Sequence, residues 1–392
     1  MDQLRQALAI AGSMTWEVLW ALLLGFALSA VVQTVVRREA VVRLMGDDSP
    51  RALLAATGLG AASSSCSYAS VALARSLFRK GASFTAAMVF EIASTNLVVE
   101  LGVLLALLLG WRFAAAEYVG GPIMIVLLAV GYRVFLRRHL VDDALRQAER
   151  GVAGSMEGHA AMEMAVAGAM PWWRRLASGQ GRTAVSHIFV MEALAIWKDV
   201  VGGLLIAGAV AAWIPQRFWE GFFLTDHPLL AGLWGPIVGP LVAVVSFVCS
   251  IGNVPLAAVL WNGGISFGGV VAFLFADLII LPIINIYRKY YGWRTAAVVT
   301  GSFYLAMVLA GYTVELLFGG LGLTSGPRDA RAMQAHPSWN YTTWLNLAFL
   351  ALAMALVVRF LLTGGPAMLR AMDGDPAGAG QQPAEHRHEH PK

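Results

Sequence analysis

Long apolar runs separated by short polar segments dominate this chain. A helix crosses the hydrocarbon core of a membrane with about 20 apolar residues, and several of the runs are that long. They predict an all-α protein that crosses the membrane many times. The full spans are expected at residues 14–36, 84–110, 113–136, 184–214, 266–287, 295–318 and 341–362.

Two further apolar segments, residues 51–80 and 229–262, are interrupted near their middles by Gly, Ser or Pro. Each half has about 12 residues, which makes roughly 18 Å of helix and so about half the thickness of a bilayer. Non-helical backbone at membrane depth is tolerated where protein or a water-filled cavity surrounds it. Each segment is therefore predicted to form a re-entrant helical hairpin.

The two hairpins belong to an internal repeat. The segment CSYASVALARSLFRKGASFTAAMVFEIA begins at Cys66, and CSIGNVPLAAVLWNGGISFGGVVAFLFA begins 183 residues later, at Cys249; 11 of the 28 aligned positions are identical. Each copy has three full spans and one hairpin, and because three is odd the second copy is expected to be inverted. Inverted repeats are typical of secondary transporters, whose substrate site lies where the two copies meet.

These predictions divide the chain into six parts. We expect a first transmembrane repeat (residues 1–136), a cytoplasmic loop (137–183), a second, inverted repeat (184–318), an external loop (319–340), an extra span (341–362) and a disordered, His-containing cytoplasmic tail (363–392).

Composition and charge agree with a multi-pass membrane protein. The chain is 58% hydrophobic and only 13% charged, whereas soluble domains carry about 25% charged residues. Lys and Arg gather in the loops that the predicted topology places inside, which puts the N-terminus outside and the C-terminus in the cytoplasm. The pI near 9.2 reflects these loops and not nucleic-acid binding. Two cysteines are too few for a disulfide framework.

The two cysteines lie at the tips of the hairpins, just before each second leg. A helix N-terminus favours the thiolate form of a cysteine, and thiolate is a ligand for soft metals and metalloids. A buried cysteine can also serve only as a small hydrophobe. The predicted substrate-binding residues are Cys66 and Cys249, which are also the candidate metal or metalloid ligands, with Ser65, Ser67, Ser250 and Asn253.

Charged residues inside spans are costly and are usually functional. They can carry protons for coupling, or they can pair with Arg75, Lys198 or backbone donors and lock helices together. Arg75 itself can draw an anion, pair with Glu91 or extend to the cytoplasmic surface. The candidates for proton coupling are Asp199, Asp277, Glu91, Glu192 and Lys198.

The protein is not expected to be an enzyme. No P-loop, GxSxG or HExxH motif is present, which argues against ATP hydrolysis and hydrolase chemistry, and no cofactor is expected. The expected partners are a small-molecule or metalloid substrate and the lipid bilayer, with no nucleic acid; the sequence leaves homo-oligomers open.

The segments SSSCSYASVALARSLFRKGASF and SFVCSIGNVPLAAVLWNGGISFGGVVAFLFADLIILPIINIYRKYYG resemble the predicted permease family that includes the trivalent organoarsenical efflux permeases. The resemblance extends from about residue 31 to 318. It implies a permease of the bacterial inner (plasma) membrane whose cysteines bind a trivalent metalloid, and with it efflux and arsenical resistance. Many relatives carry a Cys-Ser-Cys tip, whereas Tyr68 and Ile251 stand here in place of the second cysteine.

Three functions follow from these observations. The first is a secondary transporter that exports a small, soft, thiol-reactive metalloid such as a trivalent organoarsenical. The second is a permease for a small anion or sulfur-containing solute, bound at the N-termini of the hairpin helices. The third is an intramembrane thiol oxidoreductase with Cys66 and Cys249 as its redox pair, although such enzymes normally pass electrons to a second thiol pair.

Overall fold

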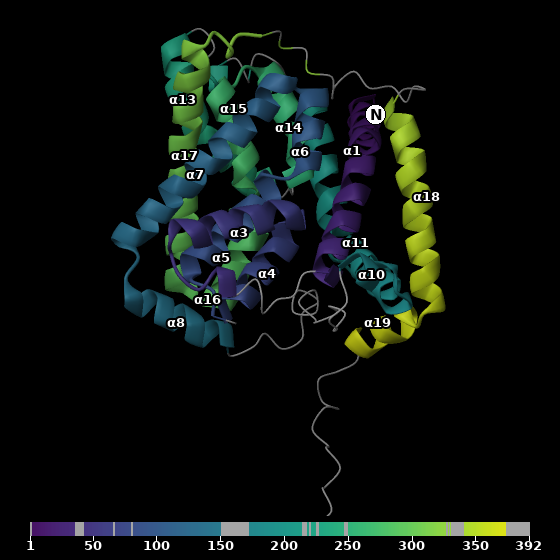
Figure 1. The fold of residues 1–392 in the computed structure, drawn as a ribbon. Helices are drawn as coiled ribbons and strands as arrows, with labels where there is room; N and C mark the ends of the chain where they lie inside the picture. Colours follow the sequence, from purple (N-terminus) through teal and green to yellow (C-terminus); the bar gives the residue numbers. More distant parts are fainter. Residues whose placement is uncertain are drawn as a thin grey trace, which may run out of the picture.

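The computed structural model describes residues 2–373 except 36–42, 66, 80, 150–171, 214–217, 219–220, 225–226, 247–249, 327, 329 and 331–340. Every regular element in this part of the chain is a helix (Figure 1). The helices of the first half are α1 (Asp2–Val35), α3 (Pro50–Ser63), α4 (Ser67–Arg79), α5 (Phe84–Asn96), α6 (Val99–Leu108), α7 (Trp111–Phe135), α8 (Arg138–Glu149) and α10 (Trp172–Ala177). Those of the second half are α11 (Gly179–Trp213), α13 (Pro228–Ser246), α14 (Ser250–Gly263), α15 (Phe267–Leu274), the 3₁₀ helix η1 (Phe275–Leu278), α16 (Leu281–Tyr291), α17 (Trp293–Gly320), α18 (Tyr341–Leu362) and α19 (Gly365–Asp373).

Four described helices are long and apolar enough to cross a membrane: α7, α13, α17 and α18. The number becomes six if the bent pairs α5 with α6 and α15–η1 with α16 are each counted as one span. Two more helices, α1 and α11, have 34 and 35 residues and pack along each other. The chain is therefore an all-α, multi-pass membrane protein.

Both predicted hairpin segments are pairs of helices, and their connections to the next helix match. After α4 the chain turns at Gly81 (φ 103°), and after α14 it turns at Gly264 (φ 107°), both in a region that favours glycine. The next helix has Ser83 or Ser266 as its N-cap, whose hydroxyl accepts a hydrogen bond from the backbone N–H three residues later. All these positions are 183 residues apart.

Two of the expected spans are not continuous helices. The span expected at 84–110 divides into α5 and α6, which are bent by 40° at Leu97 and Val98. The span expected at 266–287 divides in the same way, with a bend of 43° between η1 and α16. The prediction missed both breaks because the residues at each break are as apolar as their neighbours.

The first legs of the two hairpin segments differ in length. Helix α3 has 14 residues, close to the expected half-span, whereas α13 has 19 and is long enough to cross a membrane. Pro236 and Pro240 lie inside α13. They do not end the helix, so the prediction of a leg of about 12 residues is wrong for α13.

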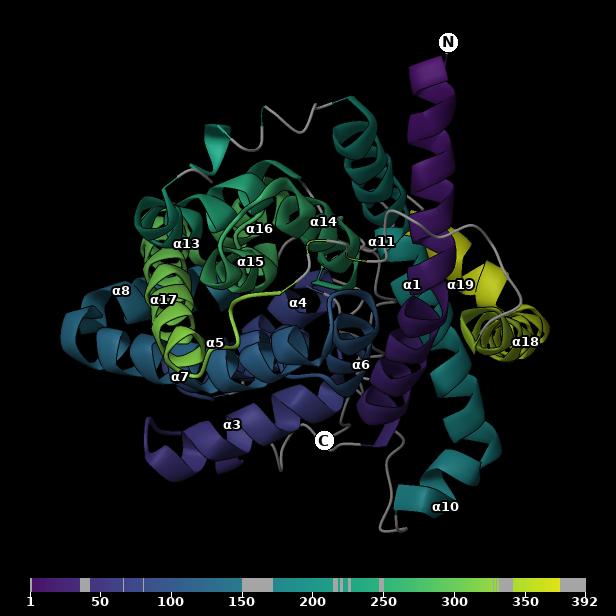
Figure 2. The ribbon, with the colours of Figure 1, turned by 90° about the horizontal axis from the view of Figure 1, so that it is seen from above.

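Figure 1 shows α3, α4 and α5 in the lower half of the molecule and α14 and α15 in the upper half. The main core joins these helices with α7, α16 and α17. Helices α1, α11 and α18 stand to one side of this body, as the view from above also shows (Figure 2).

Only 11% of the span of α18 is buried, less than in the other spans. Phe349 and Phe360 pack on the rest of the molecule, and several hydrogen bonds add to this attachment. The Asn346 amide donates to the carbonyl oxygen of Trp16 on α1 at 2.7 Å. The Ser186 hydroxyl on α11 donates to the carbonyl oxygen of Leu356 at 2.7 Å, and the Arg359 guanidinium donates to that of Gly179 at 2.9 Å.

Shorter helices α8, α10 and α19 lie at the lower end of the molecule in Figure 1. Helix α19 occupies Gly365–Asp373, so the prediction of disorder from residue 363 is wrong for this part of the tail. Residues 374–392 lie outside the described chain.

Candidate functional site

The predicted thiol ligands, Cys66 and Cys249, lie outside the described residues, as do the side chains of Glu192, Lys198 and Asp199. The site is therefore built from the residues beside the two cysteines, which the structure does describe: Ser63–Ser65 and Ser67 in the first copy, and Ser246 and Ser250 in the second.

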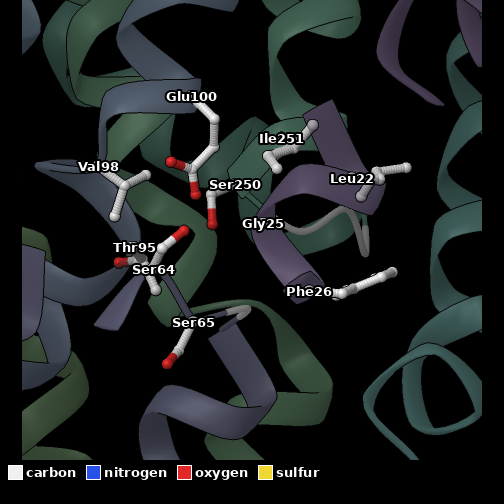
Figure 3. A pocket seen from close by; sticks show the side chains of 10 residues that line it. All are labelled: Leu22, Gly25, Phe26, Ser64, Ser65, Thr95, Val98, Glu100, Ser250 and Ile251. Carbon is white, nitrogen blue, oxygen red and sulfur yellow. The ribbon is translucent and has the colours of Figure 1, made fainter. Parts of the chain in front are cut away.

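A small cavity lies between the tips of the two helix pairs (Figure 3). Its volume of about 20 Å³ is enough for about one water molecule. The first tip contributes Ser64 and Ser65, and the second contributes Ser250 and Ile251. The remaining walls come from α1 and from the bend between α5 and α6: Leu22, Gly25, Phe26, Thr95, Val98 and Glu100. We call this space the inter-tip cavity.

Glu100 is the acid of the inter-tip cavity. It begins the first turn of α6, is only 3% exposed, and its Oε2 makes no hydrogen bond within the described chain. The Ser64 hydroxyl in the same wall also has no described partner, and Ser64 is held at φ 42°. Figure 3 shows the Glu100 carboxyl group pointing into the cavity. Sequence reasoning did not select Glu100 as a site residue.

Asp277 lies behind the tips, in the 3₁₀ turn η1, and is fully buried. Its Oδ2 accepts a hydrogen bond of 2.7 Å from the hydroxyl of Ser67, the first residue of α4. Ser250, the first residue of α14, and Asn96 also interact with this carboxyl group. The other oxygen, Oδ1, has no hydrogen-bond partner among the described residues. Three predicted residues, Ser67, Ser250 and Asp277, are thus brought together.

Glu91 forms a second buried acid site, next to Asp277. Its Oε1 accepts a short hydrogen bond from the hydroxyl of Tyr287 on α16. Its Oε2 has no described partner, and the two carboxyl groups are close enough to interact electrostatically. Sequence reasoning selected Glu91 but not Tyr287, because no pattern along the chain indicates a contact between residues 196 positions apart.

Glu117 was missed altogether. It lies on α7, is fully buried, and neither carboxyl oxygen has a partner in the described chain. Its carboxyl group interacts electrostatically with that of Asp277. The sequence signal for Glu117 was a lone acid within an apolar span. Gly120 follows it on α7, at a position where a Cβ would collide with the ring of Phe275.

Two predicted polar residues lie apart from these hydrogen bonds. Ser65 donates its backbone N–H to the carbonyl oxygen of Ser94 at 3.0 Å and lines the inter-tip cavity. Asn253 is fully buried on α14, one turn after Ser250, and neither its oxygen nor its nitrogen has a described partner. A buried polar group without partners is costly, which marks Asn253 as a candidate for contact with a ligand.

Arg75 serves a purpose that the sequence did not indicate. It is only 7% exposed and so does not extend to the surface. Its guanidinium donates to the carbonyl oxygen of Ala148 at 2.7 Å and lies 4.3 Å from the centre of the Tyr290 ring. Arg75 thereby fixes α8 against α4 and α16, and it makes no ion pair with Glu91.

These features define a class of protein. Helices of spanning length, two matched helix pairs whose tips meet at a small cavity with an acid and serines in its walls, and a helix broken beside that cavity are the features of a membrane transporter. Among the described residues, no three His, Cys, Asp or Glu side chains gather as a metal site.

Comparison with known proteins gives the family. A family model described as "Predicted permease" (ArsP_1) matches residues 3–316, and the chain belongs to this family. A Mycobacterium tuberculosis protein (strain ATCC 25618 / H37Rv) named "Putative permease Rv2963" is 66% identical over 342 residues, which is 87% of this chain and 84% of that protein. No solved structure matches the chain.

Proposed function

We propose that this permease is a secondary transporter that exports a small, soft, thiol-reactive metalloid, with a trivalent organoarsenical as the substrate class. Cys66 and Cys249 bind the substrate at the repeat interface. The observation that carries the proposal is the inter-tip cavity, because Ser65 and Ser250, each the immediate neighbour of a cysteine, line the same small space.

The chemistry of two thiols suits a methylated arsenite. Methylarsenite has two hydroxyl groups on arsenic, and each can be displaced by one thiolate, with one proton taken up and one water released. Two As–S bonds then hold the substrate, and hydrolysis of both bonds releases it unchanged. Thiolate is the preferred ligand type for such soft centres, and Ser67, Ser250 and Asn253 supply polar groups around it.

The acids beside the tips decide between this substrate and an anion. Helices α4 and α14 begin at the tips, and their N-termini favour negative charge. Asp277 already accepts a hydrogen bond from Ser67, at the start of α4, and Glu100 adds a second acid in the cavity wall. Asp277 already takes up the Ser67 hydroxyl that an anion at this helix end would use. A carboxylate at Glu100, or at Asp277 once it has given up its proton, would also repel an anion, so the anion permease is the less favoured alternative.

The arrangement of the helix pairs supports transport by alternating access. Helices α3 and α4 of the first pair lie in the lower half of the molecule and α14 of the second pair lies in the upper half (Figure 1), as two inverted copies around one site would require. We further propose the plasma membrane of a bacterium as the location, with the lower end of Figure 1 in the cytoplasm. Arg133, Arg138 and Arg174 lie on the helices of that end, in keeping with the positive-inside rule.

Growth of a metalloid-sensitive host that lacks its own exporters tests the proposal. Cells that express the wild-type chain should grow in methylarsenite, and the Cys66→Ser and Cys249→Ser variants should grow no better than the empty vector. Methylarsonate, the pentavalent form that does not react directly with thiols, should show no difference among these strains.

Immunoblots of isolated membranes confirm equal amounts of each variant. Resistance that survives in the double cysteine variant would end the proposal of thiol binding and favour the anion permease. A Cys66–Cys249 disulfide in native membranes that turns over with a quinone would favour the oxidoreductase.

A further inference from the structure

Glu91 and Asp277 are held in the same way. Each carboxyl group has one oxygen that accepts a hydrogen bond from a hydroxyl group: Tyr287 donates to Glu91 Oε1, and Ser67 donates to Asp277 Oδ2. The second oxygen of each, Glu91 Oε2 and Asp277 Oδ1, makes no hydrogen bond in the described part of the chain. Both acids are fully buried.

No cation among the described residues pairs with either acid. Neither forms an ion pair with a described residue; the pair that is seen joins Arg146 to Asp143 on α8. Two neighbouring carboxyl groups that are buried without a paired cation cannot both ionise without a large desolvation cost. At least one proton is therefore held between them.

The titratable groups that face these two acids come from four elements. Glu91 on α5 faces Tyr287 and Tyr291 on α16, Tyr132 on α7 and Asp277 on η1. Asp277 also faces Glu117 on α7. Arg75 on α4 interacts electrostatically with Tyr291.

The tyrosines continue from Glu91 toward the lower end of the molecule. The rings of Tyr287 and Tyr291 are stacked with their centres 6.3 Å apart. The Tyr291 hydroxyl is buried without a described hydrogen bond, while the residue forms part of the wall of a second cavity, of about 250 Å³. Asp143, Arg146 and Gln147 of α8 line this cavity, which we call the α8 cavity.

We propose that Glu91 and Asp277 form a proton relay that connects the inter-tip cavity with the α8 cavity. Asp277 reaches the inter-tip cavity through Ser250, which interacts with its carboxyl group and lines that cavity. Glu91 is the proton carrier on the other side, and Tyr287 is the positioning residue that fixes its Oε1. The relay deepens the proposed function and rests on it.

The substrate chemistry gives the relay its task. A thiolate that forms an As–S bond displaces a hydroxide from arsenic, and the hydroxide leaves as water only when one proton reaches it. Asp277 donates this proton and becomes a carboxylate, and Glu91 then transfers its own proton from Oε2 to Asp277 Oδ1. Glu91 is reprotonated from the α8 cavity. Hydrolysis of the As–S bond returns the proton along the same route, so that no other reagent is consumed.

Purified protein in lipid vesicles, with a pH dye enclosed and methylarsenite as the probe, tests the relay. We expect the binding of methylarsenite to cause a transient rise in pH on the side of the α8 cavity in wild-type vesicles, and Glu91→Gln to lower the rate of this rise about 100-fold, the usual range for loss of a proton-transfer group. Tyr287→Phe should cause a smaller loss. Tyr304→Phe is the matched control, because the Tyr304 hydroxyl donates to the carbonyl oxygen of Ile237 on α13 and to neither acid.

Infrared spectroscopy of the same vesicles without substrate detects the protonated carboxyl group of Glu91 directly. It therefore separates a role in proton transfer from a purely structural role. The carbonyl stretch of a protonated carboxyl group should disappear in Glu91→Gln. It should move to higher frequency in Tyr287→Phe, because the carbonyl oxygen loses its hydrogen bond, and stay unchanged in Tyr304→Phe. A spectrum without a Glu91 band, or proton movement at the wild-type rate in Glu91→Gln, would overturn the relay.

The two proposals fail differently. If export of methylarsenite requires Cys66 but proceeds at the wild-type rate in Glu91→Gln, the relay is wrong and the proposed function stands. If export persists in Cys66→Ser, the proposed function is wrong whatever the infrared bands show.

Discussion

The two copies of the repeat have the same turns and caps but different acids. Ser83 and Ser266 cap α5 and α15 in the same way, after glycines with φ of 103° and 107°. Glu91, in contrast, corresponds to Leu274 of the second copy, and Asp277 corresponds to Ser94 of the first. Positions that fix the backbone are therefore kept in both copies, while positions that carry charge are not.

This difference shows how a duplicated scaffold can hold an asymmetric site. Asp277 belongs to the second copy, yet its hydrogen bond comes from Ser67 of the first. Ser70 of the first copy donates to the carbonyl oxygen of Glu91 at 3.0 Å, whereas its counterpart Asn253 has no described partner. The copies meet as unequal halves, so protons and substrate can follow different routes through them.

Exchange of corresponding residues should have the largest effect on transport. We expect Asp277→Asn to lower methylarsenite export about 100-fold, since an amide cannot pass a proton on. Ser94→Ala, at the matching position, should retain most of the activity, because the Ser94 hydroxyl donates only to the carbonyl oxygen of Glu91, at 2.9 Å, and contacts Ser70. Uptake of radiolabelled arsenic into inverted vesicles measures both. Equal rates in the two variants would show that the acids are not functionally unequal.

Alanine substitutions at close contacts between helices should lower the free energy of unfolding by similar amounts in the two copies. A Cβ on Gly60 of α3 would lie 2.5 Å from the carbonyl oxygen of Phe90, and one on Gly239 of α13 would collide with that of Gly269. Overpacking of this kind costs about 1–3 kcal/mol, so Gly60→Ala and Gly239→Ala should each lower the free energy of unfolding by that amount. Tryptophan fluorescence during unfolding in mixed micelles measures the change.

The same helices provide the controls for these glycines. At Gly58 on α3 and Gly232 on α13, an added Cβ would have no neighbouring atom within 4 Å. Alanine at either should be neutral or slightly stabilising, because it reduces the flexibility of the unfolded chain. A loss at Gly58→Ala as large as that at Gly60→Ala would contradict the assigned packing.

The smallest effect is expected at the caps. Ser83→Ala and Ser266→Ala each remove one hydroxyl that accepts from a free N–H, at a cost of about 1 kcal/mol. Each hydroxyl also has a second contact, to the carbonyl oxygen of Asp47 in the first copy and to Glu315 in the second. The two variants should therefore lose similar stability in the same unfolding assay, and Ser83→Thr, which keeps the acceptor, should lose little. Clearly unequal losses would show that the caps are not equivalent.

The sequence was sufficient for elements that hydropathy and turn residues determine. Helices α7, α17 and α18 lie close to three of the expected spans, and α3 and α4 occupy the first predicted hairpin segment. The breaks within two other spans were missed, because apolar residues continue across them. Pro282, at the start of α16, was a usable signal for the second break, and the repeat would then have transferred it to Val99.

The acids of the site were predicted less completely than the helices. Asp277 and Glu91 could be selected as charges within apolar spans, but their partners Ser67 and Tyr287 are 210 and 196 residues away in the chain. Glu117 and Glu100 have the same signature and were not selected. A single sequence does not show which of several intramembrane acids face one cavity, because that depends on helix rotation and on the two bends.

Helix α18 has a consequence for how the protein is handled outside its membrane. Lipid tails and detergent tails solvate an exposed apolar helix equally well, so burial gives α18 little reason to stay in place. Besides the packing of Phe349 and Phe360, its attachment depends on a few polar side chains such as Asn346, Ser186 and Arg359. Substitution of these three polar side chains should loosen α18 while the two repeats keep their fold. Helix α18 would then be the natural place to attach a tag or a crystallisation partner.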